Sequence, residues 1–216
     1  MIDPLSIKIT KDASTTIYHS KFNECYHSQH GAIQESLHVF IKNGLFTVQS
    51  SPLCIFEMGF GTGLNAYLTA LHSTQPISYD CIELYPLSKE LVSGLNYPQM
   101  LNGSEDLFHL LHDVSWNQFI SITSQFELRK QHTDFSDLIF DRTYDLIYYD
   151  AFSPRIQEHL WDVSVFESLY DCLNSQGVFV TYCAKSSVRR ALLSCGFTVE
   201  KLPGPPGKRE MLRAIK

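Results

Sequence analysis

A glycine-rich turn between an apolar segment and an amphipathic one constrains the fold of this chain most strongly. Residues 54–58 read Cys-Ile-Phe-Glu-Met, residues 59–65 read Gly-Phe-Gly-Thr-Gly-Leu-Asn, and the amphipathic pattern continues to residue 71. Glycine tolerates the backbone angles of a tight turn and lets the main chain approach a ligand closely. The segment therefore predicts a buried strand, a ligand-binding loop and a helix in direct succession.

The remaining sequence alternates between short apolar segments and longer amphipathic ones. Strands are predicted at residues 78–84, 126–129, 144–149, 178–182, 197–202 and 210–215, and helices at residues 88–95, 160–173 and 187–195. This alternation indicates βαβ units, and so a Rossmann-like α/β fold. We expect a mostly parallel, seven-stranded sheet with helices on both faces. In such sheets, ligands bind beyond the carboxyl ends of the strands.

The first fifty residues have a different pattern. Residues 7–10 and 16–19 alternate in polarity, and the polar residues 11–14 between them predict a hairpin. Residues 34–41 predict a helix, which Asn43-Gly44 ends. We therefore expect residues 1–50 to be an N-terminal extension that packs on a single structural unit of residues 51–216.

Composition excludes several classes of protein. None of the 216 residues belongs to an apolar run near 18 residues, and the first residues lack a signal peptide's pattern, so we expect a cytoplasmic protein without a membrane segment. The six cysteines form no C-x-x-C pair and favour reduced thiols. The histidine pairs at 27/30 and 109/112 lack further ligands at suitable spacing, so we expect no metal site.

Charge argues against strong non-specific binding of nucleic acid, because the formal net charge is −6. A local basic cluster is nevertheless present near the C-terminus. It consists of Lys185, Arg189, Arg190, Lys201, Lys208, Arg209 and Arg213.

The spacing of the glycines favours one cofactor over another. The loop reads G-x-G-x-G, one residue shorter than the dinucleotide pattern G-x-G-x-x-G, and Glu57 precedes it by two residues. A carboxylate there would repel a pyrophosphate but suits the ammonium group of a methionine moiety, which favours S-adenosylmethionine over NAD. Glu83, after the second strand, can accept both ribose hydroxyls of either cofactor. Asp134, after the third strand, can accept from the adenine amino group, although Asp137 is an alternative.

The fourth strand runs into Asp150-Ala151-Phe152-Ser153-Pro154. Its position resembles that of the catalytic Asp/Asn-Pro-Pro-aromatic motif of amino-group methyltransferases. A carboxylate can attract a protonated amine and take its proton before methyl transfer. Phe152, together with Tyr182, can stack on a base or flank a cation. A turn or helix-capping role for Asp150 is the structural alternative.

Seven segments in one order resemble the methyltransferase half of the bifunctional bacterial family that completes 5-methylaminomethyl-(2-thio)uridine at the tRNA wobble position. They are residues 59–65, 150–154, 160–161, 181–182, 188–190, 196–197 and 207–212. The resemblance covers residues 22–216. It implies a class I S-adenosylmethionine-dependent methyltransferase fold and methylation of the amine of 5-aminomethyl-(2-thio)uridine at position 34.

The resemblance also implies partners and site residues. Because the chain ends at Lys216, we expect the stand-alone form, which lacks the FAD-dependent oxidase half and needs no FAD, no metal and no obligate protein partner. The tRNA anticodon loop is the implied partner. The implied catalytic residues are Asp150 and Phe152. The implied cofactor-binding residues are Glu57, Gly59, Phe60, Gly61, Thr62, Gly63, Asn65 and Glu83, to which the position after the third strand adds Asp134. The resemblance implies that Lys208, Arg209 and Glu210 lie near the active site or the tRNA. From residue type and the basic cluster, we also expect substrate or tRNA contacts at Tyr182, Lys185 and Arg189. Tyr26 and residues 29–35 are expected to close over the cofactor.

Two other hypotheses stay open at the level of sequence. A polyamine-synthase-like amine alkyl transferase would share the sheet, the glycine loop and the aspartate after strand four. A non-catalytic methyltransferase-like binding module would share the fold, although the retained Glu57, Glu83 and Asp150 argue against it.

Overall fold

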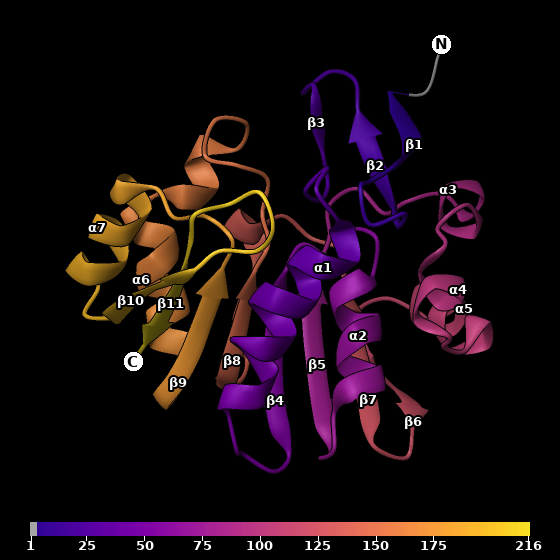
Figure 1. Ribbon diagram of the computed structural model, residues 1–216. Helices are drawn as coiled ribbons and strands as arrows, with labels where there is room; N and C mark the ends of the chain where they lie inside the picture. The colour runs from indigo at the N-terminus through magenta and orange to yellow at the C-terminus, as the bar shows by residue number, and fades with distance from the viewer. Residues whose placement is uncertain (1–3) are drawn as a thin grey trace.

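An eight-stranded sheet forms the centre of the computed structural model, which describes residues 4–216. The strand order is β10-β11-β9-β8-β4-β5-β7-β6 (Figure 1). The strands are β4 (Leu53–Met58), β5 (Ile77–Ile82), β6 (Phe119–Thr123), β7 (Phe126–Gln131), β8 (Tyr144–Tyr149), β9 (Leu173–Thr181), β10 (Thr198–Pro203) and β11 (Glu210–Ile215). Within this sheet only β6 and β11 run against the other strands. The predicted mostly parallel α/β fold is confirmed.

The helices of the described part of the chain cover both faces of this sheet. The α-helices are α1 (Ala32–Ser36), α2 (Leu64–His72), α3 (Lys89–Ser93), α4 (Tyr97–Leu101), α5 (Glu105–Asp113), α6 (Val163–Cys172) and α7 (Ser186–Ser194). A π-helical turn, η1 (Leu37–Lys42), continues α1, and 3₁₀ turns occur at η2 (Leu45–Thr47), η3 (Phe135–Asp137) and η4 (Glu158–Trp161). None of these helices is both long and apolar enough to cross a membrane.

The predicted number of seven strands is wrong, because the sheet has an additional edge strand, β6. It pairs antiparallel with β7, and only Ile122 among its residues is buried. An edge strand pairs on one side only and buries few residues, so its apolar pattern is weak. Helices α4 and α5 were not predicted either.

The sheet reverses its direction of growth at β4. From β4 the chain crosses through α2 to β5 on one side, while β8, much later in the sequence, pairs in parallel with the other side of β4. This arrangement is a topological switch point, where α/β sheets bind their ligands. The glycine loop leaves the carboxyl end of β4 at this point.

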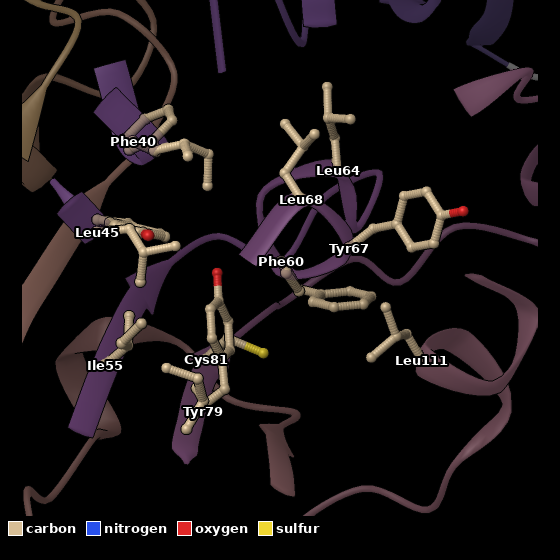
Figure 2. Packing of buried hydrophobic residues seen from close by; sticks show 14 of the residues in the cluster. Phe40, Leu45, Ile55, Phe60, Leu64, Tyr67, Leu68, Tyr79, Cys81 and Leu111 are labelled. Atoms are coloured by element: carbon tan, nitrogen blue, oxygen red, sulfur yellow. The ribbon is translucent and has the colours of Figure 1, made fainter. Parts of the chain in front are cut away.

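Two hydrophobic clusters hold the helices to the sheet. Alternate residues of β4 point to opposite faces, so Ile55 joins one cluster and Phe56 joins the other. The first cluster combines η1, α2, α5 and the sheet, and Figure 2 shows Phe40, Leu68 and Leu111 among its members. The second cluster combines α6, α7 and the opposite face.

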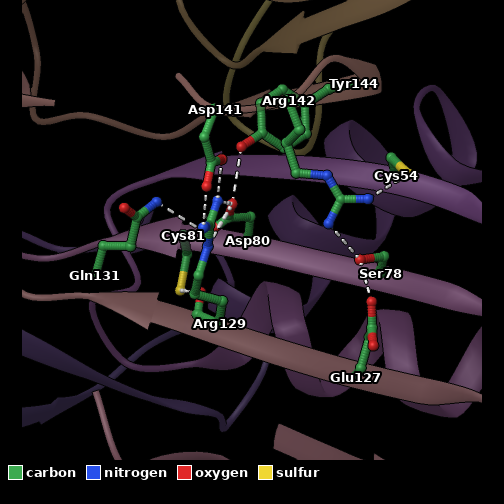
Figure 3. Close-up of polar contacts among 10 residues, drawn as sticks. All are labelled: Cys54, Ser78, Asp80, Cys81, Glu127, Arg129, Gln131, Asp141, Arg142 and Tyr144. Carbon is green, nitrogen blue, oxygen red and sulfur yellow. Dashed lines mark hydrogen bonds and ion pairs between the residues drawn. The ribbon is translucent and has the colours of Figure 1, made fainter. Parts of the chain in front are cut away.

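A buried charge fixes the register of β5 and β7. Asp80 of β5 is fully buried and forms an ion pair with Arg129 of β7 (Figure 3). Tyr144 Oη donates to Asp80 at 2.8 Å, and Gln131 Nε2 donates to it at 3.0 Å. A buried charge is costly without such partners, so this network favours one pairing of the strands.

The N-terminal segment forms the predicted hairpin and helix. Strand β1 (Leu5–Ile9) pairs antiparallel with β2 (Thr15–His19), and β3 (Glu24–Cys25) completes a three-stranded sheet. Figure 1 shows this small sheet standing beyond one end of the central sheet. The helical residues 32–42 instead lie against the central sheet, where Phe40 contacts Tyr148 with 5.2 Å between ring centroids.

Candidate active site

A cavity of about 590 Å³ lies where the glycine loop, the ends of β5, β7 and β8, and the N-terminal sheet meet. Of the residues predicted to bind the cofactor or substrate, it is lined by Gly59, Phe60, Gly61, Thr62, Asn65, Glu83, Asp134, Asp150 and Phe152. The volume is typical of small-molecule sites. Predicted site residues that follow different strands are thus brought together around one cavity.

The glycine loop has the backbone geometry that its sequence predicts. Gly59, Gly61 and Gly63 adopt φ values of 85°, 50° and 70°, which side chains disfavour. At Gly61 an added Cβ would also lie 3.3 Å from the Tyr26 ring. Gly63 does not line the cavity; it is the N-cap of α2.

Two carboxyl groups at adjacent strand ends share one amide donor. Asn65 Nδ2 lies 2.9 Å from Glu57 Oε1 and 2.9 Å from Asp150 Oδ2. Glu57 is 1 % exposed and sits behind Asn65, outside the cavity wall, whereas Asp150 faces the cavity. Asn65 therefore links the end of β4 to the residue that follows β8.

Burial raises the pKa of both carboxyl groups. Burial, with the charge of Glu35, raises the pKa of Asp150 to about 8, although Asn65 and Lys208 lower it in part. Burial, with the charge of Asp150, raises the pKa of Glu57 well above its usual range. Removing charge from water disfavours the ionised form of each acid. A cation in the cavity would favour ionisation of Asp150.

Glu83 supports the glycine loop. Its carboxylate accepts hydrogen bonds from the backbone N–H groups of Gly61 and Tyr85, each at 2.8 Å. Asp134, which follows β7, also lines the cavity. Its carboxylate caps η3 by accepting a hydrogen bond from Ser136 N at 2.9 Å. Both side chains thus have protein partners and remain in the cavity wall.

Hydrogen bonds fix the loop that carries Asp150 and Phe152. Tyr182 Oη donates to the Ala151 carbonyl at 2.8 Å, and Trp161 Nε1 donates to the Phe152 carbonyl at 2.8 Å. Tyr182 therefore acts behind this loop and does not line the cavity.

The predicted basic cluster divides into ion-paired and exposed residues. Lys208 Nζ lies 2.5 Å from Glu35 and 3.9 Å from the centre of the Tyr182 ring. Lys201 pairs with Glu210 at 3.1 Å, and Arg213 with Glu200 at 2.7 Å. Lys185 and Arg209 are exposed, and Arg189 is half-buried. None of the predicted C-terminal contacts lines the cavity.

Sequence reasoning missed several cavity residues. They include His19, Lys21, Phe22, His27, Thr133, Phe135, Gln157 and His159. Most belong to segments whose local pattern carries no recognised motif. Tyr26, which we expected to close over the cofactor, does line the cavity; of residues 29–35, Glu35 instead pairs with Lys208.

The C-terminal half of the chain matches a family model. Residues 109–216 match the S-adenosyl-L-methionine-dependent methyltransferase model Methyltransf_30. The chain belongs to this methyltransferase family.

Curated relatives align with nearly the whole length of this methyltransferase chain. It is 30% identical over 211 residues to the "tRNA 5-methylaminomethyl-2-thiouridine biosynthesis bifunctional protein MnmC" of Polaromonas naphthalenivorans, covering 91% of this chain and 33% of that protein. The chain thus spans about one third of the length of such relatives.

Solved structures agree on the fold. The crystal structure of MNMC2 from Aquifex aeolicus superposes with a TM-score of 0.78 and 25% identity, covering 97% of this chain and 70% of that one. A spermidine synthase from Thermotoga maritima superposes with a TM-score of 0.61 at 13% identity, covering 98% and 68%. The latter likeness shows the fold alone.

The methyltransferase site fits a cationic nucleoside cofactor. Positive-φ glycines bring the backbone to the cavity wall, and the carboxyl groups of Glu83, Asp134 and Asp150 line it. Among residues 4–216, no group of three or more histidine, cysteine, aspartate or glutamate side chains is arranged to hold a metal ion.

Proposed function

We propose that this methyltransferase uses S-adenosylmethionine to methylate the primary amine of 5-aminomethyl-(2-thio)uridine at the tRNA wobble position. The observation that carries the proposal is the Asp150 carboxyl group, which faces the cavity and is held by Asn65 at 2.9 Å. The relatives that match about 90% of this chain support this choice of substrate, because their names refer to tRNA 5-methylaminomethyl-2-thiouridine biosynthesis.

The positions of these residues around the cavity support the following cofactor-binding roles. Residues 59–62 and Asn65 would border the methionine part, Glu83 the ribose and Asp134 the adenine. Glu57 would act indirectly, because it lies behind Asn65 and orients its amide. Gly63 would serve the turn itself. Residues 51–216 would form the catalytic unit, and the N-terminal extension would complete its cavity.

Asp150 would take the proton that the substrate amine must lose. When bound, S-adenosylmethionine supplies a methyl group on a positively charged sulfur, which leaves with the electron pair of the broken carbon–sulfur bond. An alkylamine is mostly protonated at neutral pH, and its lone pair must be free to form the new nitrogen–carbon bond. Asp150, ionised by nearby positive charge, would accept that proton, and Phe152 would border the substrate. Methyl transfer is a substitution without oxidation or reduction, so the proposed reaction does not need FAD.

The tRNA contacts would lie outside the cavity. Arg209 and Lys185 are exposed cations suited to phosphate groups. Lys208 and Tyr182, which pack together, would instead shape the loop after β8. Arg189 and Glu210 remain proposed contacts at the edge of this surface. A tRNA substrate would set the reaction in the cytoplasm.

A labelling experiment tests the proposal directly. Transfer RNA from cells that lack this methylation step is incubated with the protein and methyl-labelled S-adenosylmethionine, then digested to nucleosides. We expect label in 5-methylaminomethyl-(2-thio)uridine, and labelling at least about a hundredfold slower when Asp150→Asn replaces the wild type. Unlabelled tRNA would reject the substrate. Propylamine transfer from decarboxylated S-adenosylmethionine would replace it with the polyamine-synthase alternative.

A further inference from the structure

The N-terminal sheet supplies one wall of the cavity that holds Asp150. His19 ends β2, and Lys21 and Phe22 lie in the turn between β2 and β3. All three line the cavity together with Asp150 and Phe152. A group that enters this cavity therefore meets side chains of the small sheet as well as those of the central sheet.

Aromatic rings connect this wall to the loop that carries Asp150. Phe22 meets Phe152 edge to face, with 5.8 Å between ring centroids, and Tyr26 meets the same ring at 4.9 Å. His19 stacks on Phe22 at 4.0 Å and an interplanar angle of 16°. Because Phe152 follows Asp150 by only two residues, a flat group whose amine reaches Asp150 would lie beside these rings.

A hydrogen bond also holds the two segments together. Ser153 Oγ lies 3.1 Å from Glu24 Oε2, although the two residues are 129 positions apart in sequence. Glu24 begins β3, directly after the turn that carries Phe22. The aromatic wall is therefore held at the Asp150 loop by a polar contact as well as by ring packing.

Phe22 is 39% exposed, so burial in the hydrophobic core does not explain its position. Aromatic side chains at nucleic-acid sites stack on bases, and bases that undergo chemistry are turned out of their stack. Lys21 is exposed beside Phe22 and also borders the cavity. A cation at that place suits the phosphate backbone next to such a base.

We propose that His19, Phe22 and Phe152 form the aromatic wall of the slot in the cavity that receives the target uracil base, with Lys21 contacting the adjacent phosphate. This inference rests on the proposed function, because it names the residues that would recognise the base of the same tRNA substrate. It makes the N-terminal sheet the element that selects a base for the methyltransferase.

Substitutions at Phe22 test the slot, because this exposed ring can be changed without opening the core. Phe22→Leu keeps an apolar side chain but removes the aromatic face, and Phe22→Trp restores one. Phe46→Leu is the matched control, since Phe46 is 62% exposed and does not line the cavity. Each variant is measured for its Kd for S-adenosylmethionine by calorimetry, and for kcat and KM with tRNA that carries the unmethylated aminomethyl group.

We expect Phe22→Leu to lower kcat/KM for this tRNA about tenfold or more, with the cofactor Kd unchanged. Phe22→Trp should stay near the wild type, as should Phe46→Leu. An unchanged kcat/KM in Phe22→Leu would overturn the proposed slot. A cofactor Kd weakened as much as kcat/KM falls would also overturn it, because the ring would then bind the cofactor. A wild-type protein that leaves tRNA unmethylated would instead reject the proposed function, and the slot with it.

Discussion

Asn65 Nδ2 donates to Asp150 Oδ2 at 2.9 Å and to Glu57 Oε1 at 2.9 Å. One neutral donor group thereby holds two carboxyl groups from the ends of β4 and β8. Glu57 is buried and Asp150 is half-buried, and the charge of Asp150 adds to burial in disfavouring ionisation of Glu57. Burial and the charge of Glu35 therefore favour the protonated form of Asp150, while Asn65 and Lys208 oppose them in part.

Asp150→Asn should abolish most turnover while retaining cofactor binding. The amide keeps the size of the side chain but cannot accept the proton from the substrate amine. General-base and positioning losses are about 10²- to 10⁴-fold in kcat. Single-turnover methylation of tRNA, with calorimetry for the cofactor, checks both parts. Equal rates in the two proteins would remove Asp150 from the mechanism.

The same variant should change how stability depends on pH. The pKa of Asp150 is raised from 3.8 to about 8 by burial and the charge of Glu35, so the folded protein holds a proton that the unfolded chain has already lost. Stability from this group is complete below about pH 4 and is lost as pH rises towards 8.

Thermal unfolding of the ligand-free proteins measures this effect. The stability advantage of Asp150→Asn over the wild type should grow between about pH 5 and 8, by up to about 1.4 kcal/mol per pH unit, and then level off. Parallel curves for the two proteins would contradict the raised pKa.

Asn65→Leu should destabilise the protein by removing the shared donor. A buried acceptor left without its partner costs about 1–3 kcal/mol. The loss should be larger at pH 9 than at pH 6, because ionised carboxylates need the amide more than neutral acids do. Denaturant unfolding at both values checks this expectation. A loss that is the same at both would mean that the substituted side chain disturbs packing only.

The ion pair between Lys208 and Glu35 should stabilise the packing of the N-terminal segment against the C-terminal segment. Glu35 is 6% exposed, so Lys208→Met leaves a buried charge without its partner and should lower stability by about 1–3 kcal/mol. Glu35→Gln with Lys208→Met should be less destabilised than the sum of the single changes. Strict additivity in this double-mutant cycle would show that the two residues are not coupled.

Arg209→Ala should weaken tRNA binding and flatten its dependence on salt, because Arg209 is exposed. For a contact to one phosphate, the slope of log K against log salt should decrease by about 0.7–0.9. Lys201→Ala is the matched control, since Lys201 already pairs with Glu210 at 3.1 Å. If both variants bind tRNA alike across a salt series, Arg209 is not a phosphate contact.

Local features of the chain are readable from its sequence. The strand, positive-φ turn and helix of residues 53–72 follow from apolar periodicity and three glycines, since these act between near neighbours. Alternation of strands and helices also predicts a parallel sheet, and hence that Glu83 and Asp150 share one edge. The edge strand β6 escaped prediction because its residues bury little.

Only the tertiary structure decides which distant segments complete the cavity. Ser153 contacts Glu24 across 129 positions, and Lys208 contacts Glu35 across 173. The pattern of a hairpin specifies its own pairing but not the surface on which it docks. The aromatic wall around Phe22 and the placement of Glu57 behind Asn65 therefore follow from packing between elements, which a linear sequence does not display.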